Sequence, residues 1–232
     1  MKKRLISILL LCCMVLTLLP TAAFAAGKIE VGTEEELLAA PAGPMDTIPK
    51  YDVSIDVYNR TSDISIKDSR SYYIYSSVPD KLRDTWAWDK KIFIKGDKAA
   101  PHVFIDGVNI KMSPSSKGPA IELNKKASAY IYFIGKNSSL QGADGRAAIQ
   151  KNRSEGQLYV LARTGTTVTC KGGDKAAGIG GSYATRNISN GYYNGDMYGH
   201  GVNMHFGSQS NPDYWGGTIA AIGGRNGAGI GA

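Results

Sequence analysis

The chain contains little cysteine, with 3 in 232 residues. Two of these, Cys12 and Cys13, lie in an N-terminal apolar segment that we expect to be removed during export. Only Cys170 would then remain, which excludes an internal disulfide in the mature chain. A nucleophilic thiol needs a neighbouring base, whereas a free cysteine usually packs as a small apolar side chain. We therefore expect Cys170 to be buried and inert.

The sequence also lacks an apolar run long enough for a membrane-spanning helix, which needs about 20 residues. The longest candidate, Leu5–Leu19, follows the basic residues Lys2–Arg4 and precedes the small-residue site Ala23–Ala25. A basic start, a short apolar run and a small-x-small site are typical of a secretory signal peptide. The sequence predicts that residues 1–25 are cleaved and that the mature chain is secreted or held at the cell surface, outside the membrane. An uncleaved anchor is the alternative.

The net charge of the chain is also small. Lys and Arg number 27 against 20 Asp and Glu, which gives a formal net charge of +7. Three of the positive charges leave with the signal peptide, so the mature chain carries +4 on 207 residues. So small an excess on an exported chain argues against a nucleic-acid partner and leaves an anionic surface polymer open.

Helical patterning is confined to short segments. Thr33 followed by Glu36 forms a capping box, and the segment that it opens ends before Pro41. We expect residues 26–50 to form a short helix and a Pro-containing linker, and a further helical turn around Asp80–Trp86. Elsewhere apolar residues alternate with polar ones, which predicts strands. The clearest alternations are Val53/Ile55/Val57, Ile64/Ile66, Ile92/Ile94 and Val103/Ile105.

A repeat is visible in the second half of the chain. Residues 165–181 align without gaps on residues 216–232, 51 positions further on, with 8 of 17 residues identical. A fainter copy ends at Ile149, 30 positions before Ile179, and another ends at Ile121, a further 28 positions upstream. The step of 51 corresponds to two coils, or to one coil with a long insertion.

Repeats of this length indicate a solenoid. The period-two pattern and the 28 glycines exclude helical repeats, and the fixed leucines of leucine-rich repeats are missing. We predict an all-β parallel β-helix over residues 51–232, with an aromatic-rich insertion at 182–215; the alternative is a chance Gly-rich run of low complexity. Cys170 should lie level with Leu140 and Ala221. One interior ladder should contain Ile121, Ile149, Ile179 and Ile230.

The blocks Ala177–Gly181 and Gly227–Gly231, with Gly217–Ile219 and Val103–Ile110, resemble the repeats of a family of secreted Gram-positive surface proteins. Members of that family are described as carbohydrate-binding-domain proteins with a pectin-lyase-like, right-handed β-helix. The resemblance covers about Tyr51–Ala232 and implies that fold, but it implies no catalytic residues. Two strong Gly-rich blocks are present where longer relatives carry several.

The last residues, 227–232, are as repeat-like as any in the chain, and no charge follows Arg225. Terminal repeats of solenoids normally carry a polar, atypical cap. We therefore expect the β-helix to be incomplete at its C-terminus, either as a fragment of a longer repeat protein or with another chain covering that end. Self-association through the uncapped coil is the expected consequence.

The insertion is the first candidate binding surface, because loops that leave a rigid scaffold tend to carry function. Tyr and Trp faces can pack on the C–H faces of sugar rings. We expect carbohydrate binding by Tyr183, Tyr192, Tyr193, Tyr198, Tyr214 and Trp215. The alternative is that these rings pack on one another and only stabilise the loop. A second cluster, Tyr72–Tyr75 with Trp86 and Trp88, has the same two interpretations.

Catalytic signatures are missing. Asp144 and Asp174 occupy matching repeat positions, so adjacent coils would bring them about 5 Å apart, as in retaining glycosidases or around a shared cation. The alternative is a pair of solvated turn residues. His200 and His205 fall on opposite faces of a strand, which disfavours a metal site. We therefore expect no catalytic residues, no metal and no cofactor.

These features favour a non-catalytic protein of the cell surface or extracellular matrix of a Gram-positive bacterium. Its β-helix would bind a polysaccharide, cell-surface glycan or other surface polymer, as a carbohydrate-binding module or adhesin. One alternative is a β-helix polysaccharide lyase or glycoside hydrolase, since fold does not determine function. The other is a passive structural stalk.

Overall fold

The computed structural model describes residues 48–113, 118–182, 201–208 and 213–231. This part of the chain is all-β, with strands β1 to β16 and one short 3₁₀ turn, η2 (Asp80–Leu82). The turn lies within Asp80–Trp86, where the sequence predicts a helical turn. The signal segment and the helix expected after Thr33 lie outside the described residues.

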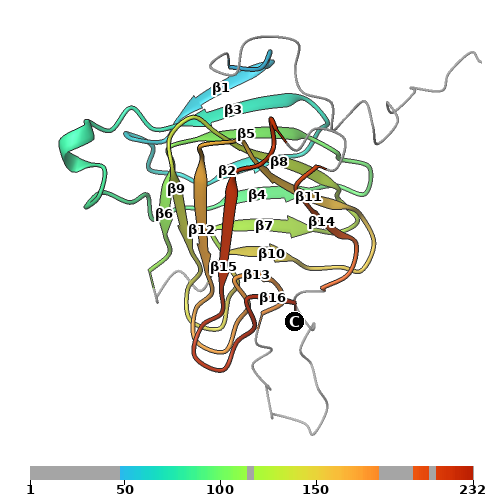
Figure 1. Cartoon of the computed structure of the whole chain (residues 1–232). Helices are drawn as coiled ribbons and strands as arrows, with labels where there is room; N and C mark the ends of the chain where they lie inside the picture. The colour runs from blue at the N-terminus through green and yellow to red at the C-terminus, as the bar shows by residue number, and fades with distance from the viewer. Residues whose placement is uncertain (1–47, 114–117, 183–200, 209–212, 232) are drawn as a thin grey trace, which may run out of the picture. The chain divides into compact units, whose positions relative to one another are not determined.

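The strands form three parallel sheets, A, B and C (Figure 1). Sheet A contains, in order, β1 (Val53–Asp56), β3 (Ser71–Tyr75), β5 (His102–Asp106), β8 (Ala129–Ile134), β11 (Leu158–Ala162) and β14 (Met204–Phe206). Sheet B contains β2 (Ile64–Ile66), β4 (Ile92–Lys95), β7 (Ile121–Asn124), β10 (Ile149–Lys151), β13 (Ile179–Gly180) and β16 (Ile230–Gly231). Sheet C contains β6 (Asn109–Lys111), β9 (Ser138–Gln141), β12 (Thr167–Lys171) and β15 (Thr218–Ile222).

From β5 onward each coil contributes one strand to each sheet, in the order A, C, B, whereas the first two coils contribute strands to sheets A and B alone. β5, β6 and β7 form one such coil, and β8 then returns to sheet A beside β5. Coils with all three strands start at β5, β8, β11 and β14. Because the strands pair in parallel with their counterparts one coil away, the predicted parallel β-helix is confirmed. Its right-handed sense stays a prediction.

Ladders of apolar side chains fill the interior of the coils. Four isoleucines of sheet B pair in register from coil to coil, as the repeat predicts: Ile121, Ile149, Ile179 and Ile230. The same ladder continues upstream through Ile92 to Ile64. On sheet C, Cys170 lies in register between Leu140 and Ala221 and has no exposed surface, so its predicted burial is confirmed.

The step of 51 residues is one coil with an insertion. β13 pairs directly with β16, and β12 pairs directly with β15, so no further coil separates them. The range expected as an insertion, residues 182–215, also contains β14, which pairs with β11 and supplies the sheet A strand of the last coil. Most of the excess length therefore lies between Ser182 and β14, at the corner from sheet B to sheet A, and five further residues of the excess lie between β14 and β15.

The repeated glycines mark the corner from sheet C to sheet B, where successive coils approach closely. A Cβ atom on Gly173 would lie 1.9 Å from the carbonyl oxygen of Ala143 in the preceding coil. A Cβ atom on Gly224 would lie 1.8 Å from the carbonyl oxygen of Gly173. Glycine allows this approach because it has no Cβ. The contact explains why the Gly-Gly pair recurs in the repeat.

Between β3 and β4 the chain leaves the solenoid for an excursion over residues 76–87, which includes η2. Trp88 ends the excursion by bridging to Ile110 of β6. Its indole is 3 % exposed, and its Nε1 donates a hydrogen bond to the carbonyl oxygen of Arg60 at 2.7 Å. The anchored indole brings the excursion back beside the first strand of sheet C.

Candidate polymer-binding groove on sheet C

The outer face of sheet C is polar, whereas its inner face is apolar. Strand alternation turns the core residues Ile110, Leu140 and Cys170 inward. Their neighbours Asn109, Ser139 and Thr169 therefore point outward, in register on consecutive coils about 4.8 Å apart. Asn137 and Thr167 form a second outward row, two residues earlier along the strands.

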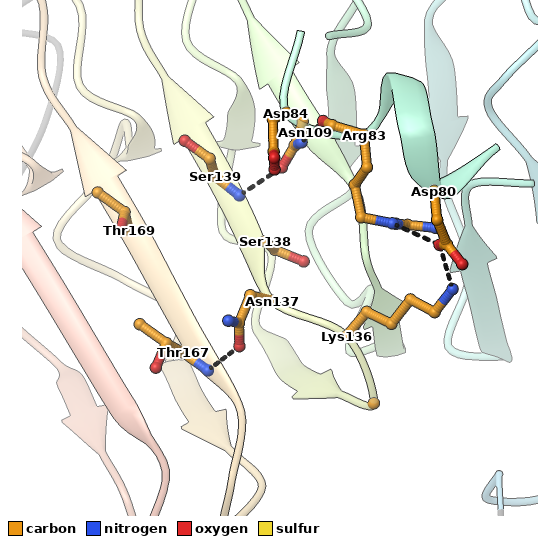
Figure 2. A pocket seen from close by; sticks show the side chains of 11 residues that line it. Asp80, Arg83, Asp84, Asn109, Lys136, Asn137, Ser138, Ser139, Thr167 and Thr169 are labelled. Atoms are coloured by element: carbon orange, nitrogen blue, oxygen red, sulfur yellow. Dashed lines mark hydrogen bonds and ion pairs between the residues drawn. The ribbon is translucent and has the colours of Figure 1, made fainter. Parts of the chain in front are cut away.

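This face is the floor of an open groove of about 710 Å³, a volume within the range of ligand-binding pockets. Figure 2 shows side chains from three parts of the chain lining it. The excursion provides Asp80, Arg83 and Asp84; sheet C provides Asn109, Ser139, Thr167 and Thr169; the corner before β9 provides Lys136 and Asn137.

The wall of the groove is fixed by Arg83 and Lys136. Arg83 Nη1 donates to the carbonyl oxygen of Gly107 at 3.0 Å, and Asn109 Nδ2 donates to the carbonyl oxygen of Arg83 at 2.9 Å. Asp80 Oδ1 accepts hydrogen bonds from Lys136 Nζ at 2.9 Å and Arg83 Nε at 3.3 Å (Figure 2). Lys136 and, to a smaller extent, Arg83 hold the pKa of the Asp80 carboxyl below its ordinary value. Asp80 is therefore ionised at neutral pH.

The polar groups on the groove floor fall into two sets. Asn109 Oδ1 accepts from the Ser139 main-chain N–H at 3.0 Å, and Asn137 Oδ1 accepts from the Thr167 N–H at 2.7 Å, which fixes both amides. The side-chain hydroxyls of Ser139, Thr167 and Thr169 make no hydrogen bond within the described ranges. The groove thus combines fixed amides with available hydroxyls at a regular spacing.

Two of the six rings predicted to bind carbohydrate are described, and both are buried. Tyr214 is 8 % exposed and Trp215 is 3 % exposed. Their rings pack edge to face at 4.7 Å, and Trp215 also packs on Tyr132 of sheet A at 5.1 Å. For this pair the structure agrees with the packing interpretation of the insertion. The other four, Tyr183, Tyr192, Tyr193 and Tyr198, lie outside the described residues, and sugar binding by them stays a prediction.

An aromatic stack on the outer face of sheet A was not anticipated from the sequence. The rings of His102, Tyr130, Tyr159 and His205 stack across four strands, with successive centroids 4.8, 4.6 and 4.4 Å apart. Tyr130 and Tyr159 are 6 % and 2 % exposed. Burial lowers the pKa of His102, which favours the neutral imidazole. The two buried tyrosine rings stabilise the sheet and offer little free surface to a ligand, whereas His102 is half-buried and His205, at the end of the stack, is exposed.

The second aromatic cluster divides between core and surface. Tyr72 and Trp88 belong to the core. Tyr73 and Tyr75 point to the outer face of sheet A, where their rings stack at 5.1 Å. Trp86 is half-buried and packs against the core. The cluster therefore does not form one surface, because Tyr72 and Trp88 lie in the core while Tyr73 and Tyr75 stack on the outer face of sheet A.

The acids that the repeat aligns are turn residues. Asp144 and Asp174 lie on adjacent coils, where the Gly145 N–H donates to the Asp174 carbonyl oxygen at 2.9 Å. The Asp174 carboxylate accepts from Arg225 Nε at 3.0 Å and Nη2 at 3.2 Å. Arg225 thereby lowers the pKa of Asp174 and keeps this carboxyl ionised. This pairing favours the turn interpretation over an acid–base pair.

Burial raises the pKa of the Cys170 thiol to about 12, so the thiolate needed for nucleophilic attack is scarce at neutral pH. Among the residues that the structure describes, no three His, Cys, Asp or Glu side chains are grouped as metal ligands. His205 Nε2 lies 2.8 Å from Gln157 Oε1. His200 falls outside the described residues.

The groove is not predicted from the sequence, although the repeat contains part of the pattern that would indicate it. Ser139 and Thr169 directly precede Leu140 and Cys170, which the repeat already aligns. Their hydroxyls could therefore have been placed on one outward row. The wall residues Asp80 and Arg83 leave no such signal, because the excursion that carries them has no counterpart in other coils.

Within the described residues, no helix is long and apolar enough to cross a membrane. Membership of the family of secreted Gram-positive surface proteins, which the repeats resemble, stays a prediction. Comparisons with protein-family models, with curated proteins and with solved structures find no match for this chain.

Proposed function

We propose that this chain is a non-catalytic polysaccharide-binding module whose ligand lies in the groove on sheet C. The row Asn109, Ser139 and Thr169 carries the proposal, because it presents one polar side chain per coil along the groove floor. An extended sugar chain advances by a length comparable to one strand spacing per ring. A repeating ligand therefore meets an equivalent set of protein groups at each coil.

The chemistry of the floor suits sugar hydroxyls, which both donate and accept hydrogen bonds. The hydroxyls of Ser139, Thr167 and Thr169 have the same double capacity. They stand on paired strands, and the neighbouring amides of Asn109 and Asn137 are held by main-chain N–H groups. Such a preorganised array loses little conformational entropy when a ligand binds.

The groove favours binding over turnover. Hydrolysis of a glycosidic bond needs a carboxylic acid that stays protonated, paired with a second carboxylate. Asp80 does not suit the acid role, because Lys136 lowers its pKa and holds it ionised. The lining then offers one other carboxylate, Asp84. The signal peptide expected at residues 1–25 supports action outside the cell, as a surface or matrix protein.

The test is titration calorimetry of the mature chain, residues 26–232, against a panel of oligosaccharides. Thr169→Val and Ser139→Ala each remove one groove hydroxyl and should weaken binding about fivefold, the effect of one hydrogen bond of about 1 kcal/mol. Thr218→Val is the matched control, because Thr218 is an outward threonine on β15 that does not line the groove.

Saturable binding that both groove variants weaken, and that the control leaves unchanged, supports the proposal. Cleavage of any oligosaccharide would indicate a lyase or glycoside hydrolase instead. Binding to no member of the panel would favour a passive stalk. Binding that is insensitive to Thr169→Val and Ser139→Ala would locate the ligand elsewhere, for example on the tyrosines predicted in the insertion.

A further inference from the structure

A third column of side chains runs across the outer face of sheet C, beside the residues that line the groove. Lys111 of β6, Gln141 of β9 and Lys171 of β12 are in register on consecutive coils. Each directly follows an inward core residue, so all three point to the outer face of sheet C. They therefore lie on the same face as the groove floor, two residues further along the strands.

The two lysines of this column are available to a ligand. Both are exposed, and neither Nζ makes a hydrogen bond or ion pair with any residue that the structure describes. The cations that line the groove differ in this respect. Lys136 pairs with Asp80 at 2.9 Å, and Arg83, whose side chain is 17 % exposed, is bonded to Asp80 and to the Gly107 carbonyl.

The charges alternate along the column. Lys111 and Lys171 lie two coils apart, which corresponds to about 9.6 Å, and the neutral Gln141 separates them. Asp84 in the wall of the groove is exposed and has no partner among the described residues. The column beside the groove floor is thus positive at Lys111, neutral at Gln141 and positive at Lys171, while the groove wall carries the carboxylate of Asp84, unpaired within the described residues.

We propose that the ligand of the groove is an acidic polysaccharide with a carboxylate on every second sugar, lying along the stacked coils with its carboxylates at Lys111 and Lys171. The inference rests on the proposed function and adds the charge pattern of the ligand. A chain that advances one ring per coil places alternate rings opposite the lysines and the neutral ring opposite Gln141. Asp84 repels carboxylates from the wall and so orients the chain.

The test compares three octasaccharides: one of hyaluronan, with a carboxylate on alternate sugars; one of galacturonate, with a carboxylate on every sugar; and a neutral N-acetylated chitin chain. Lys111→Gln and Lys171→Gln should each weaken hyaluronan binding by up to about fivefold and reduce its salt dependence, while binding of the neutral chain stays unchanged. Lys98→Gln, at an exposed lysine in the corner between β4 and β5, is the charge-matched control and should change nothing.

Gln141→Lys gives the sharpest test, because it makes the column continuously positive. The ratio of galacturonate to hyaluronan affinity should rise by up to about fivefold. Failure of every octasaccharide to bind would overturn the proposed function itself. A neutral chain that binds as tightly as hyaluronan, together with inert lysine variants, would overturn the charge pattern alone. Inorganic polyphosphate that binds as tightly as hyaluronan would also overturn it, since the column would then recognise charge without a sugar.

Discussion

Ile179 and Ile230 pair in register on sheet B, although 51 residues separate them in the chain. Ile179 also pairs with Ile149 on its other side and has no exposed surface, whereas Ile230 is 49 % exposed. The two residues have the same side chain and the same place in the repeat. The difference arises because described strands flank β13 on both sides and flank β16 on one.

Ile179→Asp should unfold the chain or abolish soluble secretion. The new carboxylate would be buried between coils without a partner, at a cost above about 4 kcal/mol or with a strongly raised pKa. Ile222→Asp, at an outward position that is 46 % exposed, should stay within about 0.5 kcal/mol of wild type. Thermal melts followed by circular dichroism measure both, and wild-type melting of Ile179→Asp would show that this residue is not interior.

Gly173→Ala should destabilise the fold far more than Gly165→Ala. The Cβ on residue 173 would lie 1.9 Å from the Ala143 carbonyl oxygen and would push successive coils apart. At Gly165, where φ is +83° and no atom lies within 4 Å, alanine adds only backbone strain of about 1–2 kcal/mol. Urea unfolding compares the two variants, and equal losses would contradict the close approach of coils at this corner.

The stability of the chain should fall above pH 9 through Cys170. Burial raises the pKa of this thiol from 9.0 to about 12, so in that window the unfolded chain releases a proton that the folded chain keeps. The contribution is complete below pH 9 and is lost by about 1.4 kcal/mol per pH unit up to pH 12. Cys170→Ala should show a flatter profile in urea unfolding. A native thiol that reacts quickly with Ellman's reagent at pH 8 would show that Cys170 is accessible.

The last coil should be the least protected part of the described solenoid. Like β1, β2 and β6, the last-coil strands β14, β15 and β16 have described partners on one side only. The last coil also contains Gly227, Gly229 and Gly231, and glycine loses the most entropy on ordering. The amides of β15 and β16 should exchange faster than those of β12 and β13. Light scattering over a concentration series should show the association predicted for this end, and a strictly monomeric chain with a protected last coil would contradict both expectations.

The inward half of the solenoid could be predicted from the sequence, because stacked coils must repeat the residues that fill their core. The repeat and its fainter upstream copies placed Ile121, Ile149, Ile179 and Cys170 in their ladders correctly. The first coils carry no such block, so Ile64 could be recognised as part of a strand but not as the start of the ladder.

The outward half could be predicted only in part, because outward positions need not repeat. The wall of the groove depends on Asp80 and Arg83, from an excursion found in a single coil. Lys151 is an exception to the expectation that inward positions hold apolar residues. It is 1 % exposed, pairs with Leu123, and donates from Nζ to the carbonyl oxygens of Ser154 and Glu155 at 3.0 and 2.9 Å. A lysine within an alternating strand pattern predicts an exposed side chain. The periodicity of the sequence does not predict that the carbonyl groups of the following turn will accept hydrogen bonds from Nζ.

The corners of the coil differ in how closely they pack against the neighbouring coil. At the corner after β12, Gly173 is so close to the preceding coil that not even a methyl group fits. At the corner after β13, the chain from Ser182 to β14 is long, yet β13 and β16 still pair in register. The scaffold therefore excludes side chains at one point of the first corner, whereas it accommodates a long segment at the second. A foreign peptide grafted after Ser182 would be displayed from a solenoid whose isoleucine ladder remains intact.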